Sequence, residues 1–140
     1  MCPERRPLVS RWEALLSEEL SGNMKLGEVI KLVEGTLLSR GANLDIAISR
    51  ACGADLMSDV LTFTKARALL LTGLTNPQVI RTAEMADIAA IVFVRGKLPP
   101  PETIALAEEK GIPIIAAKHT LFEICGRLYQ AGLTGCDPAG

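Results

Sequence analysis

The sequence predicts an α/β domain with a mainly parallel sheet, in either two or three layers, built from successive strand–helix units. Three short apolar runs, at residues 69–72, 90–94 and 112–117, show no alternation with polar residues. Strands of this kind have to be covered on both faces, which is the pattern of parallel sheets with crossover helices. A turn and then a helix-start signal follow each run. We therefore expect three consecutive strand–turn–helix units between Leu69 and Leu133.

The helices of these units begin and end at recognisable residues. Asn76 and Pro77 open the first helix, since proline is favoured at the first helical position. The second helix begins near Pro101 and ends at Gly111, a residue type that suits a helix end. The third helix begins at Thr120, which has the spacing of a capping box with the glutamate three residues later. Repetition of this unit brings the three turns to the same edge of the sheet.

The part of the chain before Leu69 has a weaker pattern. Residues 24–35 predict a helix, and residues 36–39 and 45–49 predict two short strands. Residues 55–63 predict another helix, capped by Asp55 or Ser58. The inner face of that helix is expected to consist of Leu56, Val60 and either Leu61 or Phe63. We expect this section to be a small addition laid against the main sheet.

The domain organisation has three parts. An N-terminal extension, residues 1–23, precedes the α/β domain of residues 24–133, and residues 134–140 are expected to be a flexible tail. In the extension, a capping box starting at Ser10 introduces an amphipathic helix. Its apolar face consists of Trp12, Leu15, Leu16 and Leu20. That face has to rest on its own domain or on a partner subunit, and the sequence leaves both possibilities open.

Composition excludes several classes of protein. The chain has 140 residues, of which 49% are apolar and only 4% aromatic, so a single domain with an aliphatic core is expected. The net charge of −1 gives no general attraction to nucleic acid or to an anionic membrane surface. No apolar run approaches the ~20 residues that a membrane helix needs, and the start of the chain does not resemble a signal peptide. We therefore expect a cytoplasmic protein that binds neither nucleic acid nor a membrane.

The cysteines give no sign of a metal centre. Cys2, Cys52, Cys125 and Cys136 are widely spaced and form no C-x-x-C pair, so neither a metal nor another cofactor is predicted. Cys52 and Cys125 are expected to be buried free thiols. A reactive dyad of a thiol with His119, the only histidine, is the less favoured alternative.

In open α/β sheets, ligands bind at the carboxyl ends of the strands. Helix amino termini point at the same edge here and present unpaired N–H groups with a partial positive charge. A phosphate group, a nucleotide or an acidic peptide would suit this edge, whereas the alternative interpretation is a set of solvated turn residues. The candidate ligand-binding residues are Thr72, Gly73, Asn76, Arg95, Gly96, Lys97, Lys118 and His119.

A second group of polar residues stands at the start of the helix predicted over residues 55–63. Asp55, Ser58 and Asp59 could bind a metal ion or a ligand hydroxyl group. Hard cations usually need more oxygen ligands than this segment supplies, so helix capping is the favoured interpretation. The sequence shows no acid–base pair, nucleophile triad, glycine-rich phosphate loop or metal-ligand spacing, so no catalytic residues are predicted.

Three segments, taken in order, carry a family resemblance. They are DLMSDVLTF at 55–63, LLLTGLTNPQ at 69–78 and IALAEEKGIP at 104–113. On these segments, the stretch from Met24 to Leu133 resembles a DRTGG domain, a family similar to the amino-terminal domain of bacterial HPr kinase/phosphatase. DRTGG domains also accompany CBS domains in regulated pyrophosphatases and occur in long forms of phosphotransacetylase, as regulatory or dimer-forming modules.

The resemblance implies a non-catalytic regulatory module that senses a ligand, such as a nucleotide or a phosphorylated metabolite, and acts on a partner enzyme. Stand-alone members of this length are similar to proteins encoded near genes for iron hydrogenases and NADH-dehydrogenase-like proteins. The alternative is therefore a structural adaptor that dimerises and docks on a hydrogenase or another redox enzyme. A homodimer is expected, because an aliphatic domain with an additional amphipathic helix has apolar surface to spare.

Overall fold

The structure, a computed structural model, describes residues 24–136. Residues 1–23 and 137–140 lie outside the described part of the chain. The amphipathic helix expected within the N-terminal extension therefore falls outside the described residues, and so does the end of the expected tail.

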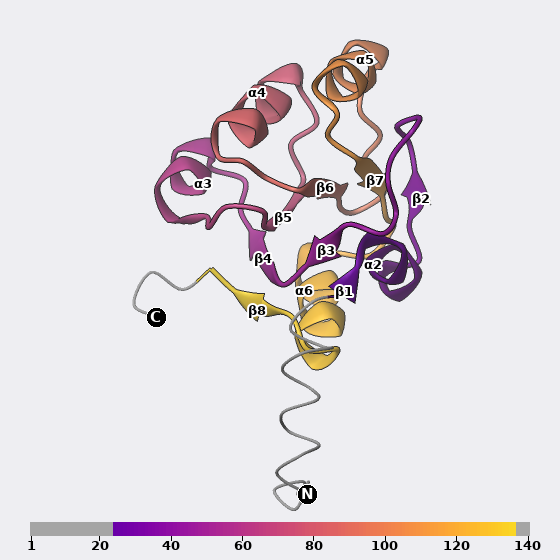
Figure 1. Ribbon diagram of the computed structural model, residues 1–140, viewed down its shortest axis with the longest axis vertical. Coiled ribbons are helices and arrows are strands. Elements are labelled where there is room, and N and C mark those ends of the chain that lie inside the picture. The colour runs from indigo at the N-terminus through magenta and orange to yellow at the C-terminus, as the bar shows by residue number, and fades with distance from the viewer. Residues whose placement is uncertain (1–23, 137–140) are drawn as a thin grey trace, which may run out of the picture.

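A six-stranded sheet forms the middle of the domain (Figure 1). The strand β2 runs antiparallel to its neighbour, and the other pairs in this sheet are parallel. The predicted α/β class with a mainly parallel sheet is thus confirmed. In spatial order the strands are β2 (Thr36–Leu37), β7 (Ile114–Ala116), β6 (Ala90–Phe93), β5 (Leu69–Thr72), β4 (Arg50–Gly53) and β8 (Thr134–Gly135).

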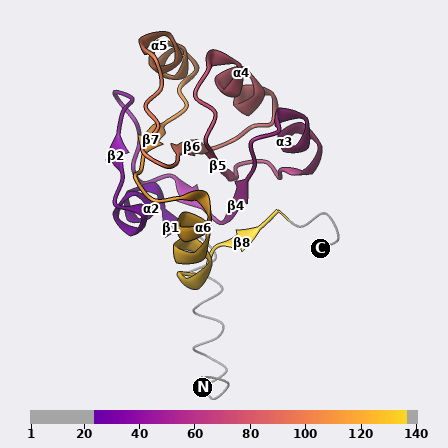
Figure 2. The same cartoon turned by 180° about the vertical axis from the view of Figure 1, so that it is seen from behind.

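Helices cover both faces of this sheet, so the domain has three layers. One face carries α3 (Met57–Phe63), α4 (Pro77–Met85) and α5 (Pro101–Lys110), and the other carries α2 (Leu26–Val33) and α6 (Leu121–Gln130), as both views show (Figures 1 and 2). A separate small sheet pairs β1 (Met24–Lys25) antiparallel with β3 (Ala47–Ile48). Within residues 24–136, every helix falls short of the length and apolar character that a membrane span requires.

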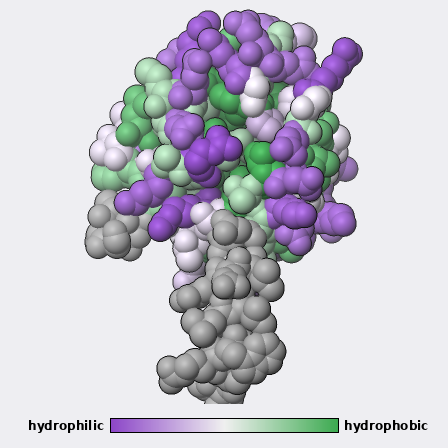
Figure 3. All heavy atoms as spheres, in the orientation of Figure 1, coloured by the Kyte–Doolittle hydropathy of each residue, from purple (hydrophilic) through white to green (hydrophobic). Residues whose placement is uncertain are grey.

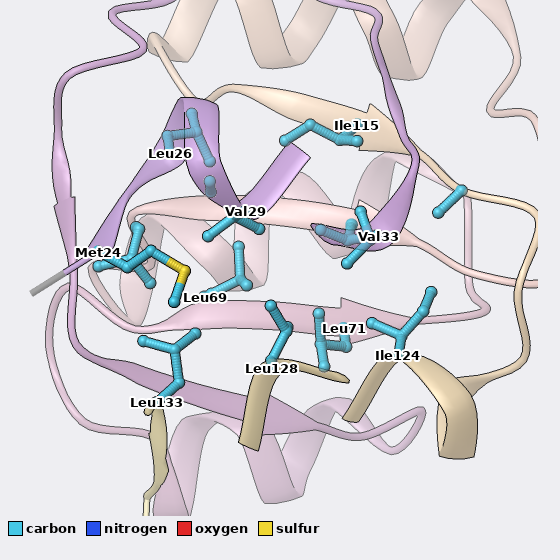
Figure 4. Packing of buried hydrophobic residues seen from close by; sticks show 14 of the residues in the cluster. Met24, Leu26, Val29, Val33, Leu69, Leu71, Ile115, Ile124, Leu128 and Leu133 are labelled. Carbon is cyan, nitrogen blue, oxygen red and sulfur yellow. The ribbon is translucent and has the colours of Figure 1, made fainter. Parts of the chain in front are cut away.

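The central strands are buried on both faces because their side chains alternate between two cores. In β5, Leu69 and Leu71 pack with the residues of α2 and α6, whereas Leu70 packs with those of α3, α4 and α5. Figure 4 shows the first of these cores, where Leu69 and Leu71 lie among side chains of the two helices. All residues of β5 and β6 are buried. Burial on both faces explains why these strands show no polar alternation.

One prediction about the front of the domain is wrong, and one strand was not predicted. The pattern predicts a helix from Met24, whereas Met24 and Lys25 form β1 and the helix begins at Leu26. Pairing with β3 keeps this backbone extended, and the Leu26 N–H donates to the Ile46 carbonyl at 3.0 Å. The sequence analysis assigns no structure to residues 50–53, which form β4 between β5 and β8. The four residues of β4 include an arginine and a glycine, so their apolar periodicity is too weak for the sequence to indicate a strand.

The helix predicted over residues 55–63 is shorter than expected and is not capped by Asp55 or Ser58. Its N-cap residue is Leu56, which has no capping side chain. Only Val60 is buried, whereas Leu56, Leu61 and Phe63 are 61%, 48% and 44% exposed. The physical reason is that the Asp55 carboxylate is held at the end of β5, so the helix starts beyond it.

The strand β8 occupies the start of the segment for which the sequence predicts a flexible tail. Thr134 and Gly135 pair in parallel with Arg50 and Ala51 of β4. Backbone pairing at the edge of the sheet orders these residues, and nothing in their periodicity marks so short a strand.

Candidate functional site

A single carboxylate joins the end of β5 to the loop after β4. Asp55 Oδ1 accepts hydrogen bonds from Thr72 Oγ1 at 2.9 Å and from the Gly73 N–H at 2.8 Å. The Leu74 N–H in turn donates to Thr72 Oγ1 at 3.2 Å. Because Thr72 is fully buried, its hydroxyl group depends on these protein partners. Asp55 thus holds the turn after β5, while its Oδ2 has no hydrogen-bond partner among the described residues.

Gly73 separates an acidic from a basic side chain. A Cβ atom at this position would lie 3.3 Å from Arg95 Nη2 and 3.7 Å from each carboxylate oxygen of Asp55. A side chain here would press on the guanidinium group, so glycine keeps the space between the two charges open. Arg95 therefore reaches from the turn after β6 to the turn after β5. Its guanidinium group makes no ion pair with another residue in the described part of the chain.

The turn after β6 is strained and firmly held. Arg95 and Gly96 have φ values of 62° and 70°, in the left-handed region. Positive φ at two successive residues is typical of a type I′ turn, which glycine adopts freely but which costs a residue with a Cβ atom about 1–2 kcal/mol. The N–H groups of Arg95 and Gly96 donate to the carbonyls of His119 and Ala117, both at 2.8 Å. The loop after β6 is therefore fastened to the loop after β7.

Four helices begin at this edge, and their first N–H groups are satisfied unevenly. Thr120 caps α6, since its Oγ1 accepts a hydrogen bond from the Glu123 N–H at 3.3 Å. The Glu123 carboxylate accepts from Arg127 Nε at 3.0 Å instead of from the Thr120 N–H, so the predicted capping box is only half formed among the described residues. Asn76 occupies the N-cap position of α4 but makes no capping hydrogen bond with its side chain. The N-cap residues of α3 and α5, Leu56 and Pro100, make none either. At the start of α4, Pro77 has no N–H and the Val79 N–H donates to the Asn76 carbonyl at 3.1 Å, so the Gln78 N–H is the donor that an anion could bind there.

Lys97 and Lys118 add positive charge to the same edge. Both side chains are exposed, and neither forms an ion pair with any residue between 24 and 136. The same edge also carries acidic side chains, since Asp59, Glu102 and Glu123 stand in the first turns of α3, α5 and α6. Charges of both signs therefore lie at this edge, and Arg95 is the cation placed beside Gly73.

The imidazole of His119 is engaged with another partner. Its Nε2 lies 2.8 Å from Glu34 Oε1 at the C-terminal cap of α2, and Arg127 Nη1 lies 3.9 Å from Glu34 Oε2. The hydrogen bond from His119, and then the positive charge of Arg127, hold the pKa of Glu34 below its ordinary value of 4.5. His119 thus contributes its backbone carbonyl to the candidate site, while its side chain joins α6 to α2.

The lowered pKa of Glu34 predicts a measurable pH effect. Because the folded-state value lies below the unfolded one, the contact stabilises the fold above pH 4.5 and its contribution is lost as the pH falls through the folded-state pKa. In His119→Ala, Glu34 should titrate closer to 4.5, while Arg127 still holds it below that value. Carbon NMR of the side-chain carboxyl group measures this midpoint. Lys118→Ala is the control, and an unchanged midpoint in His119→Ala would contradict the assignment.

The structure separates Asp55 from the other residues of the second polar group. Ser58 and Asp59 are exposed on α3, and among the described residues their side chains make no hydrogen bond with Thr72 or Asp55. Within residues 24–136, no cluster of His, Cys, Asp and Glu side chains is able to hold a metal ion. Burial, and secondarily the neighbouring Cys52, raises the pKa of the Cys125 thiol. This shift is opposite to the one that an activated cysteine nucleophile needs.

The sequence pattern misses a cavity of about 330 Å³ at the opposite edge of the sheet, where β6 and β7 begin. Four of its charged side chains form two ion pairs, Lys110 with Glu84 at 3.4 Å and Arg67 with Asp87 at 3.9 Å. Glu108 Oε2 accepts a hydrogen bond from the Arg40 N–H at 2.8 Å. The helices α4 and α5 end here, so they present carbonyl groups rather than N–H groups. The Arg40 guanidinium group also lines this cavity and makes no ion pair with any described residue. The turn signal at residues 40–43 is a feature of the sequence that could have indicated the cavity, since these residues line it.

A solved structure has a similar fold. It is the crystal structure of the CBS and DRTGG domains of the regulatory region of Clostridium perfringens pyrophosphatase, complexed with the activator diadenosine tetraphosphate, and it matches with a TM-score of 0.63 at 13% sequence identity. The match covers 89% of this chain and 54% of that one, so this chain spans about half the length of that structure. At this identity the similarity shows the fold alone. A comparison with curated proteins gave no match.

The sequence itself matches a family model. The model of the DRTGG domain matches residues 28–131, which is more than half of the chain. This range contains the three segments that carry the sequence resemblance, together with β4, β5, β6 and β7 and the turns that follow them. The chain therefore belongs to the DRTGG domain family.

Proposed function

We propose that this protein is a non-catalytic regulatory module that binds a nucleotide or a phosphorylated metabolite at the carboxyl edge of its sheet and acts on a partner enzyme. The observation that carries the proposal is the placement of Asp55 and Arg95 on either side of Gly73. The start of α4, which has no side-chain cap, follows directly. Hydrogen-bond acceptor and donor groups thus face the same open space.

These groups suit the two parts of a phosphorylated sugar. The Arg95 guanidinium group is planar and can donate two parallel hydrogen bonds to one phosphate. The Gln78 N–H in the first turn of α4 adds a donor, and the start of the helix adds a partial positive charge. Asp55 Oδ2 is a remaining acceptor for a ligand hydroxyl group. A ligand with a phosphate and a nearby hydroxyl therefore satisfies this site better than inorganic phosphate does.

The backbone strain at Arg95 supports a binding role. A non-glycine residue in the left-handed region persists only where the surrounding structure enforces it, and such residues cluster at binding sites. Here the hydrogen bonds to the loop after β7 enforce the conformation and direct the guanidinium group toward Gly73. A turn that served only to connect two elements would be more stable with glycine at this position.

The comparison with the pyrophosphatase structure supports the class of ligand. That regulatory region is complexed with a nucleotide activator, and its fold is similar to this one. In this chain, a ligand held between Asp55 and Arg95 contacts the loops after β4, β5 and β6 together. Its presence would change how firmly these loops are held, and a partner enzyme that contacts them would sense the ligand.

A thermal-shift screen against nucleotides and phosphorylated sugars tests the proposal. A ligand present at ~100 times its dissociation constant should stabilise the protein by about 2.7 kcal/mol. The matching nucleoside and inorganic phosphate are the controls, and each should shift the melting temperature less than the phosphorylated compound. If no phosphorylated compound shifts it, the regulatory proposal fails and the adaptor described next takes its place.

A structural adaptor is the second candidate, and exposed apolar side chains on α3 favour it. Leu56, Leu61 and Phe63 face water, and Met85 at the end of the adjoining α4 is 65% exposed. Figure 3 shows hydrophobic surface on the side of the molecule where α3 lies. Exposed apolar surface of this kind favours association, either as a homodimer or with a hydrogenase or another redox enzyme.

The described cysteines are free thiols, in keeping with the expected cytoplasmic location.

A further inference from the structure

An apolar groove of about 380 Å³ lies between α6 and the outer strands β4 and β8. Both views show β8 beside α6 (Figures 1 and 2). Two aromatic side chains of α6 border the groove and face water, since Phe122 is 88% exposed and Tyr129 is 73% exposed. The remaining surface is formed by small or apolar residues, including Ala51, Leu71, Cys125, Gly126, Leu128 and Leu133. Within the described residues no element covers it.

The described chain begins beside this groove. Met24, its first residue, is 7% exposed and belongs to the same buried cluster as Leu128 and Leu133. Leu128 and Leu133 also line the groove, at the end where α6 finishes. Figure 4 shows Met24 near Leu133 and Leu69. The N-terminal extension therefore joins the domain at one end of the groove.

The extension matches the groove in polarity and in length. Its predicted helix carries Trp12, Leu15, Leu16 and Leu20 on one face. At ~1.5 Å per residue, the stretch from Trp12 to Leu20 is ~13 Å long, close to the ~15 Å of α6. Residues 21–23 connect Leu20 to Met24 and reach at most ~10 Å when extended. A helix that starts from Met24 thus comes back along the groove toward Phe122.

We propose that residues 10–20 form a helix whose apolar face fills the groove of the same chain. Contact with Phe122 and Tyr129 removes apolar surface of both elements from water. The three-residue connection keeps the segment beside its own groove at an effective concentration on the order of mM, which favours it over the same segment of a second copy. The additional helix thereby completes the layer formed by α2 and α6, and the groove is closed to other partners.

Trp12 reports on this contact, because it is the only tryptophan in the chain. In the native protein of 140 residues its fluorescence emission should lie at shorter wavelength than in denaturant and should be protected from quenching by acrylamide. Gly126→Glu places a charge in the groove, and a Cβ atom at this position meets no atom within 4 Å, so the domain still folds. In this variant the emission should move toward its denatured wavelength and quenching should increase.

Gln130→Glu is the matched control, since it adds the same charge at an exposed position of α6 outside the groove and should leave the emission unchanged. Circular dichroism checks that both variants are folded. Equal native and denatured emission, or equal emission of Gly126→Glu and the unmodified protein, would overturn the proposal. Two further results together would assign the groove to a second copy of the chain and would also overturn the proposal. They are a Trp12 emission that changes when the unmodified protein is diluted, and a light-scattering mass that is halved in Gly126→Glu.

Discussion

Replacing Arg95 with alanine should weaken the binding of a phosphorylated ligand about tenfold to hundredfold. A charge-assisted hydrogen bond contributes about 1.5–3 kcal/mol, and each ~1.4 kcal/mol corresponds to a factor of ten in affinity. Alanine also carries a Cβ atom, so the left-handed backbone at this position, with φ of 62°, is strained in both proteins. The free energy of unfolding should therefore change little, and isothermal titration calorimetry with the best compound from the screen measures the loss of affinity.

Three further variants show whether this loss is specific to the site. Arg95→Lys keeps the charge but loses the planar group of donors, so it should retain only part of the affinity. Lys31→Ala on α2 and Arg81→Ala on α4 each remove an exposed cation elsewhere and should leave the affinity unchanged. Equal losses in all the alanine variants would mean that the ligand responds to the overall charge of the protein rather than to a site.

Replacing Phe93 with alanine should lower the free energy of unfolding by about 3–5 kcal/mol. Phe93 is fully buried at the end of β6, in the core beneath α3, α4 and α5. Its aliphatic neighbours can close only part of the cavity that the ring leaves. Because a domain is typically stable by about 5–15 kcal/mol, this is a large share of the total. Urea denaturation should show a lower midpoint with an unchanged slope.

Phe63→Ala is the matched control for the core variant. The Phe63 side chain is 44% exposed at the end of α3, so part of its ring already contacts water. Its removal should cost clearly less stability than removal of Phe93. Similar midpoints for the two variants would contradict the assignment of Phe93 to the core and of Phe63 to the surface.

The three strand–helix units were predictable because their signals are local. Each of β5, β6 and β7 is a run of apolar residues, and the helices that follow begin where the sequence predicts, at Pro77, Pro101 and just after Thr120. By contrast, β1, β4 and β8 were not predictable. Each has between two and four residues, and each is extended because a partner strand distant in the sequence supplies its hydrogen bonds.

The candidate site also has one part that was predictable from the sequence and one part that was not. A parallel sheet brings the ends of successive strands to one edge, so the sequence was enough to expect Thr72, Gly73 and Arg95 near one another. The contribution of Asp55 was not evident, because a residue before a helix is most simply interpreted as a cap. Its distance from Thr72 in the sequence hides the hydrogen bond between them, which measures 2.9 Å.

The sequence by itself determined the fold class, the family resemblance and the edge at which the polar turn residues gather, because periodicity and turn chemistry act over a few neighbouring residues. Tertiary structure decided which side chains face that edge. It turned His119 toward Glu34, 85 residues away in the sequence, and held Arg95 in a strained turn beside Gly73. These contacts join segments whose distance in space depends on the packing of the whole sheet, so no local pattern of residues records them.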